Sequence, residues 1–216
     1  MTGVQTCALP ICLSLEKSQH NLSLVTIGLG WDIAEKKTGF LGGLFGSQSA
    51  EYDLDVVAFL CDADGKVRDL GWDGAGNATL RDSDVIFFNN LYHRSGNIRL
   101  TGDNRTGAGD GDGDDEQIIV KLNSLSNDYQ KIVFIVQIYE GIKNNQHFGQ
   151  VDNAFIRAVD ASGKEMVRFD LSGKGYDQQR SLLFAELVRE INGWKFNALG
   201  QSSASDNFLE WLKEYV

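Results

Sequence analysis

Short runs of alternating apolar and polar residues dominate the chain, and clusters of Gly, Asn, Asp and Ser separate them. In residues 22–27 successive side chains alternate between two faces before the stretch 28–31, which we interpret as a glycine turn. Residues 54–61 are apolar on both faces, as in a strand that is buried on both sides. This succession favours an all-β sandwich or barrel over alternating strands and helices. Further strands are predicted at residues 85–88, 98–100, 117–122, 131–139, 154–159, 166–171 and 194–199.

Two short sequences predict hairpin turns, and the C-terminal residues predict a helix. Residues 62–65 would turn the chain so that residues 66–68 return along the preceding strand, and residues 161–164 would form a second turn. Residues 183–191 fit both a helical stripe and a strand, so periodicity leaves both interpretations open. Apolar residues then recur at helical spacing between 208 and 215, after a Ser-Asp pair at 205–206 that is a candidate N-cap. We expect this short helix to cover the sandwich, with a docking element as the alternative.

Length and composition indicate a single domain. The chain has 216 residues, of which 42% are hydrophobic, and this is enough for one ordinary core. Residues 1–12 resemble the translation of a sequencing-library adapter, so we assign the domain to residues 13–216. Beyond residue 12 the sequence contains one cysteine, Cys61, which fits a reducing, cytoplasmic compartment. No apolar run approaches the roughly 20 residues needed to span a bilayer.

The charge of the chain is strongly acidic and unevenly distributed. A net charge of −10 argues against nucleic acids as partners, because phosphate contacts need clustered Lys and Arg. Five acidic residues, by contrast, lie within residues 110–116, among glycines. Carboxylates packed this closely repel one another unless a cation neutralises them. Calcium takes about six to eight oxygen ligands, and glycines let a short loop converge on the ion. The segment therefore predicts calcium binding, with a solvated acidic loop as the alternative.

Carboxylates elsewhere in the chain are candidates to complete the calcium ligands. Asp53 and Asp55 are two residues apart, so on a strand they project from the same face, and Asp32 follows the predicted glycine turn. An EF-hand does not fit the acidic segment, since Asp115 stands where that loop requires Gly and Lys121 stands where it requires Glu. Scattered histidines and a single secure cysteine disfavour zinc.

Several stretches of the chain resemble the TerD family of tellurite-resistance and stress-response proteins. The similar stretches are 25–32, 52–59, 85–91, 101–107 with 110–116, and 148–157. The resemblance implies a two-sheet β-sandwich with adjacent sites for two calcium ions at one end. Inserts at 35–50 and 71–77 depart from simpler members and leave the subfamily open. The resemblance carries metal binding to Asp32, Asp53, Asp55, Asp103, Asn104, Asp110, Asp112, Asp114, Asp115 and Glu116.

The resemblance also implies a function. We expect a bacterial, cytoplasmic, calcium-binding module that is associated with tellurite resistance and the stress response. Calcium-ordered loops would present a surface to protein partners of the same stress-response system. No nucleophile stands in a recognised catalytic setting, so we expect neither an enzyme nor catalytic residues. The alternatives are a metal-dependent hydrolase that uses the same carboxylates and a peripheral module that docks on membranes through calcium and the apolar residues 40–45.

Overall fold

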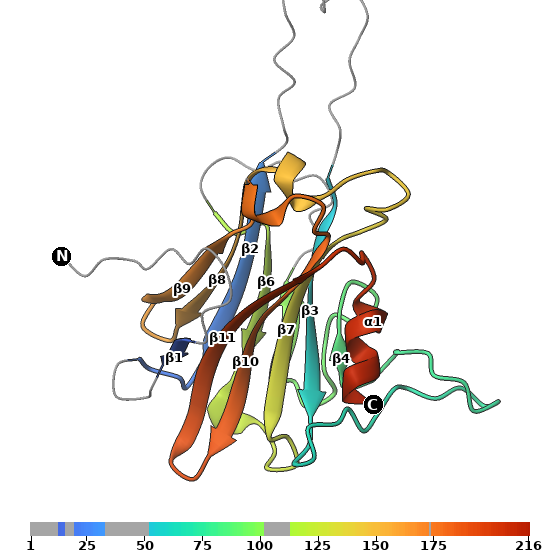
Figure 1. Ribbon diagram of the computed structural model, residues 1–216. Helices are drawn as coiled ribbons and strands as arrows, with labels where there is room; N and C mark the ends of the chain where they lie inside the picture. Colours follow the sequence, from blue (N-terminus) through green and yellow to red (C-terminus); the bar gives the residue numbers. More distant parts are fainter. Residues whose placement is uncertain (1–12, 16–19, 33–51, 102–112, 173) are drawn as a thin grey trace, which may run out of the picture.

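Two antiparallel sheets pack face to face and form a β-sandwich (Figure 1). The computed structural model describes residues 13–15, 20–32, 52–101, 113–172 and 174–216. One sheet has six strands in the order β1-β11-β10-β7-β3-β4, and the other has five in the order β5-β6-β2-β8-β9. The predicted two-sheet, mostly β fold is confirmed.

The strands of each sheet come from both halves of the chain. The six-stranded sheet contains β1 (Leu13–Leu15), β11 (Gly193–Ser203), β10 (Ser181–Glu190), β7 (Lys131–Ile138), β3 (Leu54–Cys61) and β4 (Val85–Ile86). The five-stranded sheet contains β5 (Ile98–Thr101), β6 (Glu116–Val120), β2 (Val25–Asp32), β8 (Asp152–Asp160) and β9 (Glu165–Asp170). Short helices are η2 (Leu122–Ser124), η3 (Phe148–Gln150), η4 (Lys174–Tyr176), α1 (Phe208–Leu212) and η5 (Lys213–Tyr215).

The facing sides of the two sheets form the main hydrophobic core. Alternate residues of the long strands point inward, and Ile27 of β2, Val56 of β3 and Ile156 of β8 are all inaccessible to solvent. Phe169 of β9 stacks edge to face on Phe184 of β10, with ring centroids 5.4 Å apart. Residues from both sheets therefore interdigitate, as in other sandwiches.

A second apolar cluster lies on the outer face of the six-stranded sheet, beneath α1. Phe59 of β3 packs against Phe208 of α1 with ring centroids 6.2 Å apart, and Figure 1 shows α1 beside β3 and β4. Because the main core covers one face of β3 and this cluster covers the other, all eight residues of β3 are buried, as predicted. Burial also raises the pKa of the Cys61 thiol to about 12, so this cysteine is an inert core residue.

The interpretation of residues 28–31 as a turn is wrong, since β2 continues through them to Asp32. The two glycines permit close approach by other groups instead. A Cβ atom added to Gly28 would lie 2.1 Å from Oδ2 of Asp114, and one added to Gly30 would lie 2.5 Å from the Phe155 ring. A glycine inside a strand can indicate either a bend or the close approach of another group. The sequence pattern alone did not distinguish these two possibilities.

Other local predictions are partly confirmed. The turn at 161–164 joins β8 to β9, and residues 183–191 belong to a strand, β10, up to Glu190. Residues 66–68 are not a returning strand, because after its turn the chain leaves β3 and the Val67 amide donates to the Tyr215 carbonyl, 2.7 Å away. The N-cap of α1 is Asn207 rather than the pair at 205–206.

Within the part of the chain that the structure describes, no helix is both long and apolar enough to cross a membrane. The apolar insert at 35–50, on which the membrane-docking alternative depends, lies outside the described residues.

Candidate functional site

The acid-bearing ends of β2, β3 and β6 meet at one end of the sandwich, and Trp31 links them. Its backbone amide donates to Oδ2 of Asp115 at 2.9 Å, and its indole Nε1 donates to the Tyr52 carbonyl at 2.9 Å. The Asp115 amide in turn donates to the Leu29 carbonyl at 2.7 Å. Tyr52, two residues before β3, and Asp115, the residue before β6, are therefore both fixed to the end of β2.

Glu116 links the two sheets at this end. Its side chain is 1% exposed, and Oε2 accepts a hydrogen bond from the Val56 amide of β3 at 3.1 Å. A buried carboxylate is stable only where donors or cations compensate for lost hydration. The end of the predicted acidic segment is thus anchored directly on the strand that carries Asp53 and Asp55.

Asp114 lies over β2 and has a countercharge from the protein itself. Its side chain is 3% exposed, and Oδ1 accepts from Nε of Arg157 at 2.7 Å. Gln117 donates to Oδ2 at 3.1 Å, and Gly28 leaves the space that the carboxylate fills. Burial lowers the pKa of the Arg157 guanidinium, but Asp114 and Glu165 raise it by more. Asp114 therefore forms an ion pair that fixes the end of the acidic segment to the sheet.

Asp55 is the second residue of β3, and Asp53 directly precedes this strand. The Asp55 side chain is buried, and its Oδ2 accepts from Nε2 of Gln137 on β7 at 3.1 Å. The Asp53 carbonyl accepts from the Tyr139 amide at 2.8 Å. Burial, and to a lesser extent the nearby Asp152 carboxylate, raise the pKa of Tyr52, whose carbonyl accepts from Trp31.

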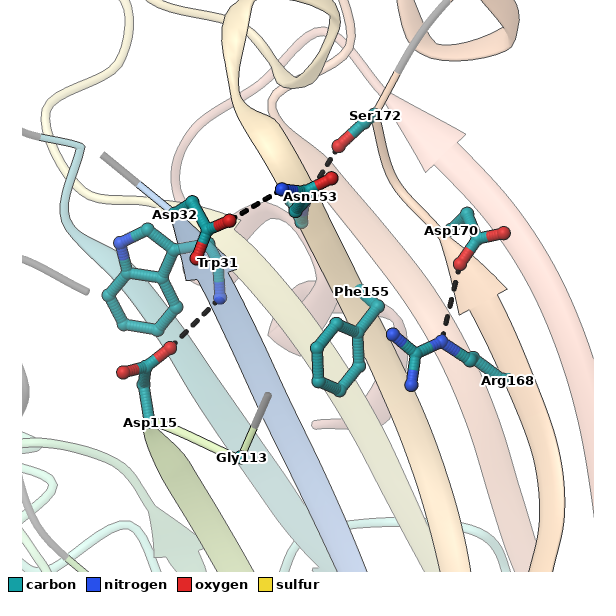
Figure 2. Close-up of a pocket in the computed structure, with 10 residues that line it drawn as sticks. Trp31, Asp32, Gly113, Asp115, Asn153, Phe155, Arg168, Asp170 and Ser172 are labelled. Carbon is teal, nitrogen blue, oxygen red and sulfur yellow. Dashed lines mark hydrogen bonds and ion pairs between the residues drawn. The ribbon is translucent and has the colours of Figure 1, made fainter. Parts of the chain in front are cut away.

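A pocket of 530 Å³ opens beside the end of β2 (Figure 2). Asp32 and Asp115 contribute carboxylates to it, and Oδ2 of Asp32 accepts from Nδ2 of Asn153. On the opposite side the Arg168 guanidinium lies 3.5 Å above the Phe155 ring and pairs with Asp170 at 3.3 Å. The pocket is lined by Trp31, Asp32, Gly113, Asp115, Asn153, Ala154, Phe155, Arg168, Asp170 and Ser172.

The described acids do not form a complete metal site by themselves. No group of three or more His, Cys, Asp or Glu side chains within the described ranges has a geometry that would hold an ion. Asp103, Asn104, Asp110 and Asp112 lie outside those ranges. Their segment is covalently joined to Thr101 at the end of β5 and to Gly113 in the wall of the pocket. The donors that are described are oxygen ligands of the kind that calcium prefers.

Sequence reasoning overlooked several residues of this end. Asp152 is the register partner of Asp32 across β2 and β8, and like charges directly opposite each other on neighbouring strands are destabilising. Asn153, Phe155 and Arg157 follow Asp152 on the same strand. All four belong to the stretch 148–157 that supported the family resemblance, and that signal was sufficient to include them as candidates.

Comparisons with known proteins agree on one family. The TerD domain family model matches residues 12–215. Tellurium resistance protein TerX of Serratia marcescens is 63% identical over 205 residues, which cover 94% of this chain and 95% of the relative. Tellurium resistance protein TerD of the same species is 39% identical, with 89% and 87% of the two chains covered. Stress response protein SCP2 of Bacillus subtilis (strain 168) is 35% identical, with 94% and 95% covered.

Solved structures agree with this result at the level of the fold. The crystal structure of a homologue of telluride resistance protein (TerD) from Streptomyces coelicolor A3(2) has a TM-score of 0.60 at 21% identity and covers 87% of this chain and 94% of its own. A second structure, of a protein of unknown function, has a TM-score of 0.65 at 21% identity, with 88% and 94% covered. From the match over residues 12–215 and from these relatives, the chain belongs to the TerD family of tellurium-resistance and stress-response proteins.

Proposed function

We propose that this protein is a calcium-binding module of tellurium resistance and the stress response, and that calcium orders its acidic end. The observation that carries the proposal is the meeting of the acid-bearing ends of β2, β3 and β6, which Trp31 and Glu116 link by hydrogen bonds. So many carboxylates at one end repel one another, and a hard divalent cation offsets that repulsion.

Two pairs of carboxylates suggest how two ions would be shared. Asp32 and Asp115 line the pocket together, and Asp53 and Asp55 stand on either side of Leu54, where β3 begins. Each pair would supply part of a ligand set, and oxygens from residues 103–112 would supply the rest. Asp114 would contribute less to calcium binding than the others, because Arg157 already neutralises it.

Calcium would supply positive charge that links side chains from separate strands and loops. The chain's own residues position that charge, since Trp31 orients Asp115 and Asn153 orients Asp32. An ordered acidic end would then present a defined surface to protein partners in the cytoplasm. The names of the relatives, tellurium resistance protein TerX and stress response protein SCP2, support assignment to such a response.

Thermal unfolding in chelator and across a calcium titration tests the proposal. A ligand that binds the native state alone adds about 2.7 kcal/mol of stability at 100 times its Kd, so Tm is expected to rise and then saturate. The double variant Asp32→Asn, Asp115→Asn should lose most of this rise. Asp170→Asn is the matched control, because Asp170 lines the same pocket but lies outside the predicted ligand set. A wild-type Tm that millimolar calcium leaves unchanged would refute the proposal.

A further inference from the structure

A row of buried polar side chains crosses the outer face of the six-stranded sheet. Asp55 of β3 is the register partner of Gln137 of β7, which is the register partner of Ser181 of β10. The three residues are 3%, 3% and 0% exposed. Polar groups at such depth are retained where hydrogen bonds satisfy them, so the partners of this row indicate what it does.

The row ends on the C-terminal helix. The backbone amide of Phe208, at the start of α1, donates to Oε1 of Gln137 at 2.7 Å. The indole Nε1 of Trp211 donates to Oγ of Ser181 at 2.9 Å. Gln137 uses the other end of its amide, Nε2, to donate to Oδ2 of Asp55 at 3.1 Å. One side chain thus connects a carboxylate at the acidic end to the first turn of α1.

We propose that Gln137 is a positioning residue of the calcium site and couples the occupancy of that site to the docking of α1. The inference rests on the proposed function, because Asp55 is one of the residues through which calcium would bind. A Gln side chain has one donor end and one acceptor end. Its acceptor end is used by Phe208, so its donor end faces Asp55 and holds that carboxylate in one orientation.

The coupling acts in both directions. If docked α1 orients Gln137, and Gln137 orients Asp55, then docking of α1 strengthens calcium binding. Linkage requires that calcium strengthen the docking of α1 by the same factor. Partners that orient a metal ligand without touching the ion commonly change metal affinity about 10- to 100-fold when they are removed.

Docking of α1 has a consequence for the surface of the protein. Phe208 and Leu212 cover the apolar cluster that contains Phe59 and Phe87. A calcium-dependent helix would therefore control whether this apolar face is covered, at a distance from the pocket at the end of β2. Removal of calcium should loosen α1 first, while the strands of the sandwich stay protected.

Hydrogen exchange with and without calcium, together with calorimetric calcium titration, tests the inference on the full chain. In the wild type, we expect calcium to slow exchange of the amides of residues 208–215. Gln137→Met removes both hydrogen bonds at similar side-chain length, and should weaken calcium binding about tenfold and abolish the calcium-dependent slowing in α1. Ser181→Ala is the matched control, since it removes the other hydrogen bond to α1 and none to Asp55. It should speed exchange in α1 and keep the calcium response, and it should lower calcium affinity much less than Gln137→Met, because the contact between Gln137 and Asp55 remains.

The possible outcomes separate this inference from the proposed function. If the wild type binds calcium but exchange in α1 does not respond, the coupling is refuted, whether or not Gln137→Met folds. Equal calcium affinity in Gln137→Met and wild type would refute the positioning role while leaving calcium binding intact. If the wild type shows no binding heat and no change in exchange anywhere, the proposed function itself is refuted.

Discussion

The two sheets present very different outer faces. Where α1 covers it, the outer face of the six-stranded sheet is mostly apolar, with Phe208 packed on Phe59 and Phe87. The outer face of the five-stranded sheet carries charged side chains of β8 and β9, and Arg157 and Arg168 are directly opposite each other in the register. Carboxylates neutralise both guanidinium groups. Asp114, which lies over Gly28, pairs with Arg157, and Asp170 pairs with Arg168.

This difference shows two ways to complete a β-sandwich. An apolar outer face must be covered, and the free energy gained scales with the area buried and is nearly independent of pH. A charged outer face stays in contact with water, and its stability depends on ion pairs and on hydrogen bonds to carboxylates. The following changes test whether the two faces differ in this way.

The largest effect is expected for Phe208→Ala on the covered face. The side chain is 6% exposed, and truncation of a buried Phe costs about 3–5 kcal/mol through lost burial and the cavity that remains. Urea unfolding at pH 6 and pH 8 should give the same loss. Leu209→Ala on the same helix is the control, because Leu209 is 40% exposed and should cost much less. Similar losses for the two variants would contradict the role of α1 as a cover.

On the charged face, Arg157→Met should lower the free energy of unfolding by about 2–3 kcal/mol, which is less than the loss expected for Phe208→Ala. The substitution keeps most of the side-chain volume but leaves the buried Asp114 carboxylate without its guanidinium, and removal of one partner from a buried pair is destabilising. We reduce the expected cost because Arg157 is 26% exposed. Arg168→Met is the comparison, since its partner Asp170 is half exposed. Urea unfolding should rank Arg157→Met as the more damaging variant, and the reverse order would be evidence against this account.

A smaller, pH-dependent effect is expected for Asp160 at the end of β8. Burial raises the pKa of this carboxyl, but donors from Ser162, Lys164 and Asn21 outweigh burial and lower it to about 2. Because the pKa is lower in the folded than in the unfolded state, the stabilisation is present above about pH 4 and is lost as the pH falls toward 2. It amounts to roughly 2 kcal/mol. Asp160→Ala should therefore be less stable than wild type at pH 6, and the difference should shrink at pH 2. A constant difference in urea midpoints would contradict this reasoning.

The smallest effect is expected for Ile191→Ser. Ile191 lies at the turn between β10 and β11 and is 102% exposed, so its side chain loses no burial on substitution. Surface changes of this kind stay within about 0.5 kcal/mol. A larger loss in thermal unfolding would show that this apolar residue is covered in solution, for example by a second copy of the chain.

Much of the fold was predictable because strand periodicity carries the information. Residues 54–61 are apolar on both faces because the main core covers one face of β3 and the cluster beneath α1 covers the other. The spacing of Phe208, Trp211 and Leu212 likewise identified α1. The glycine turn at 28–31 was wrong because glycine fits turns and close packing equally well, and only the positions of Asp114 and Phe155 distinguish them.

The candidate site was predictable by residue type but not by partner. Carboxylate spacing pointed to Asp55, the acidic segment to Asp115, and the predicted glycine turn and the family resemblance to Asp32. In the structure Asp55 lies in β3, Asp115 directly precedes β6 and Asp32 ends β2, and hydrogen bonds of Trp31 link these three ends. Nothing in the local sequence showed that Arg157 would pair with Asp114, or that Gln137 would connect Asp55 to α1. Such contacts depend on strand register and order, which a single sequence does not specify.

The contact between Gly28 and Asp114 also has a consequence for evolution. A Cβ atom at position 28 would lie 2.1 Å from Oδ2 of Asp114, so a side chain can be gained at position 28 only if the one at position 114 becomes shorter or moves. A side chain at position 28 is therefore selected against unless position 114 has already changed, whereas this contact does not oppose a shorter residue at position 114. Although the two positions lie far apart in the sequence, they are expected to change in a fixed order among descendants of this gene, position 114 before position 28.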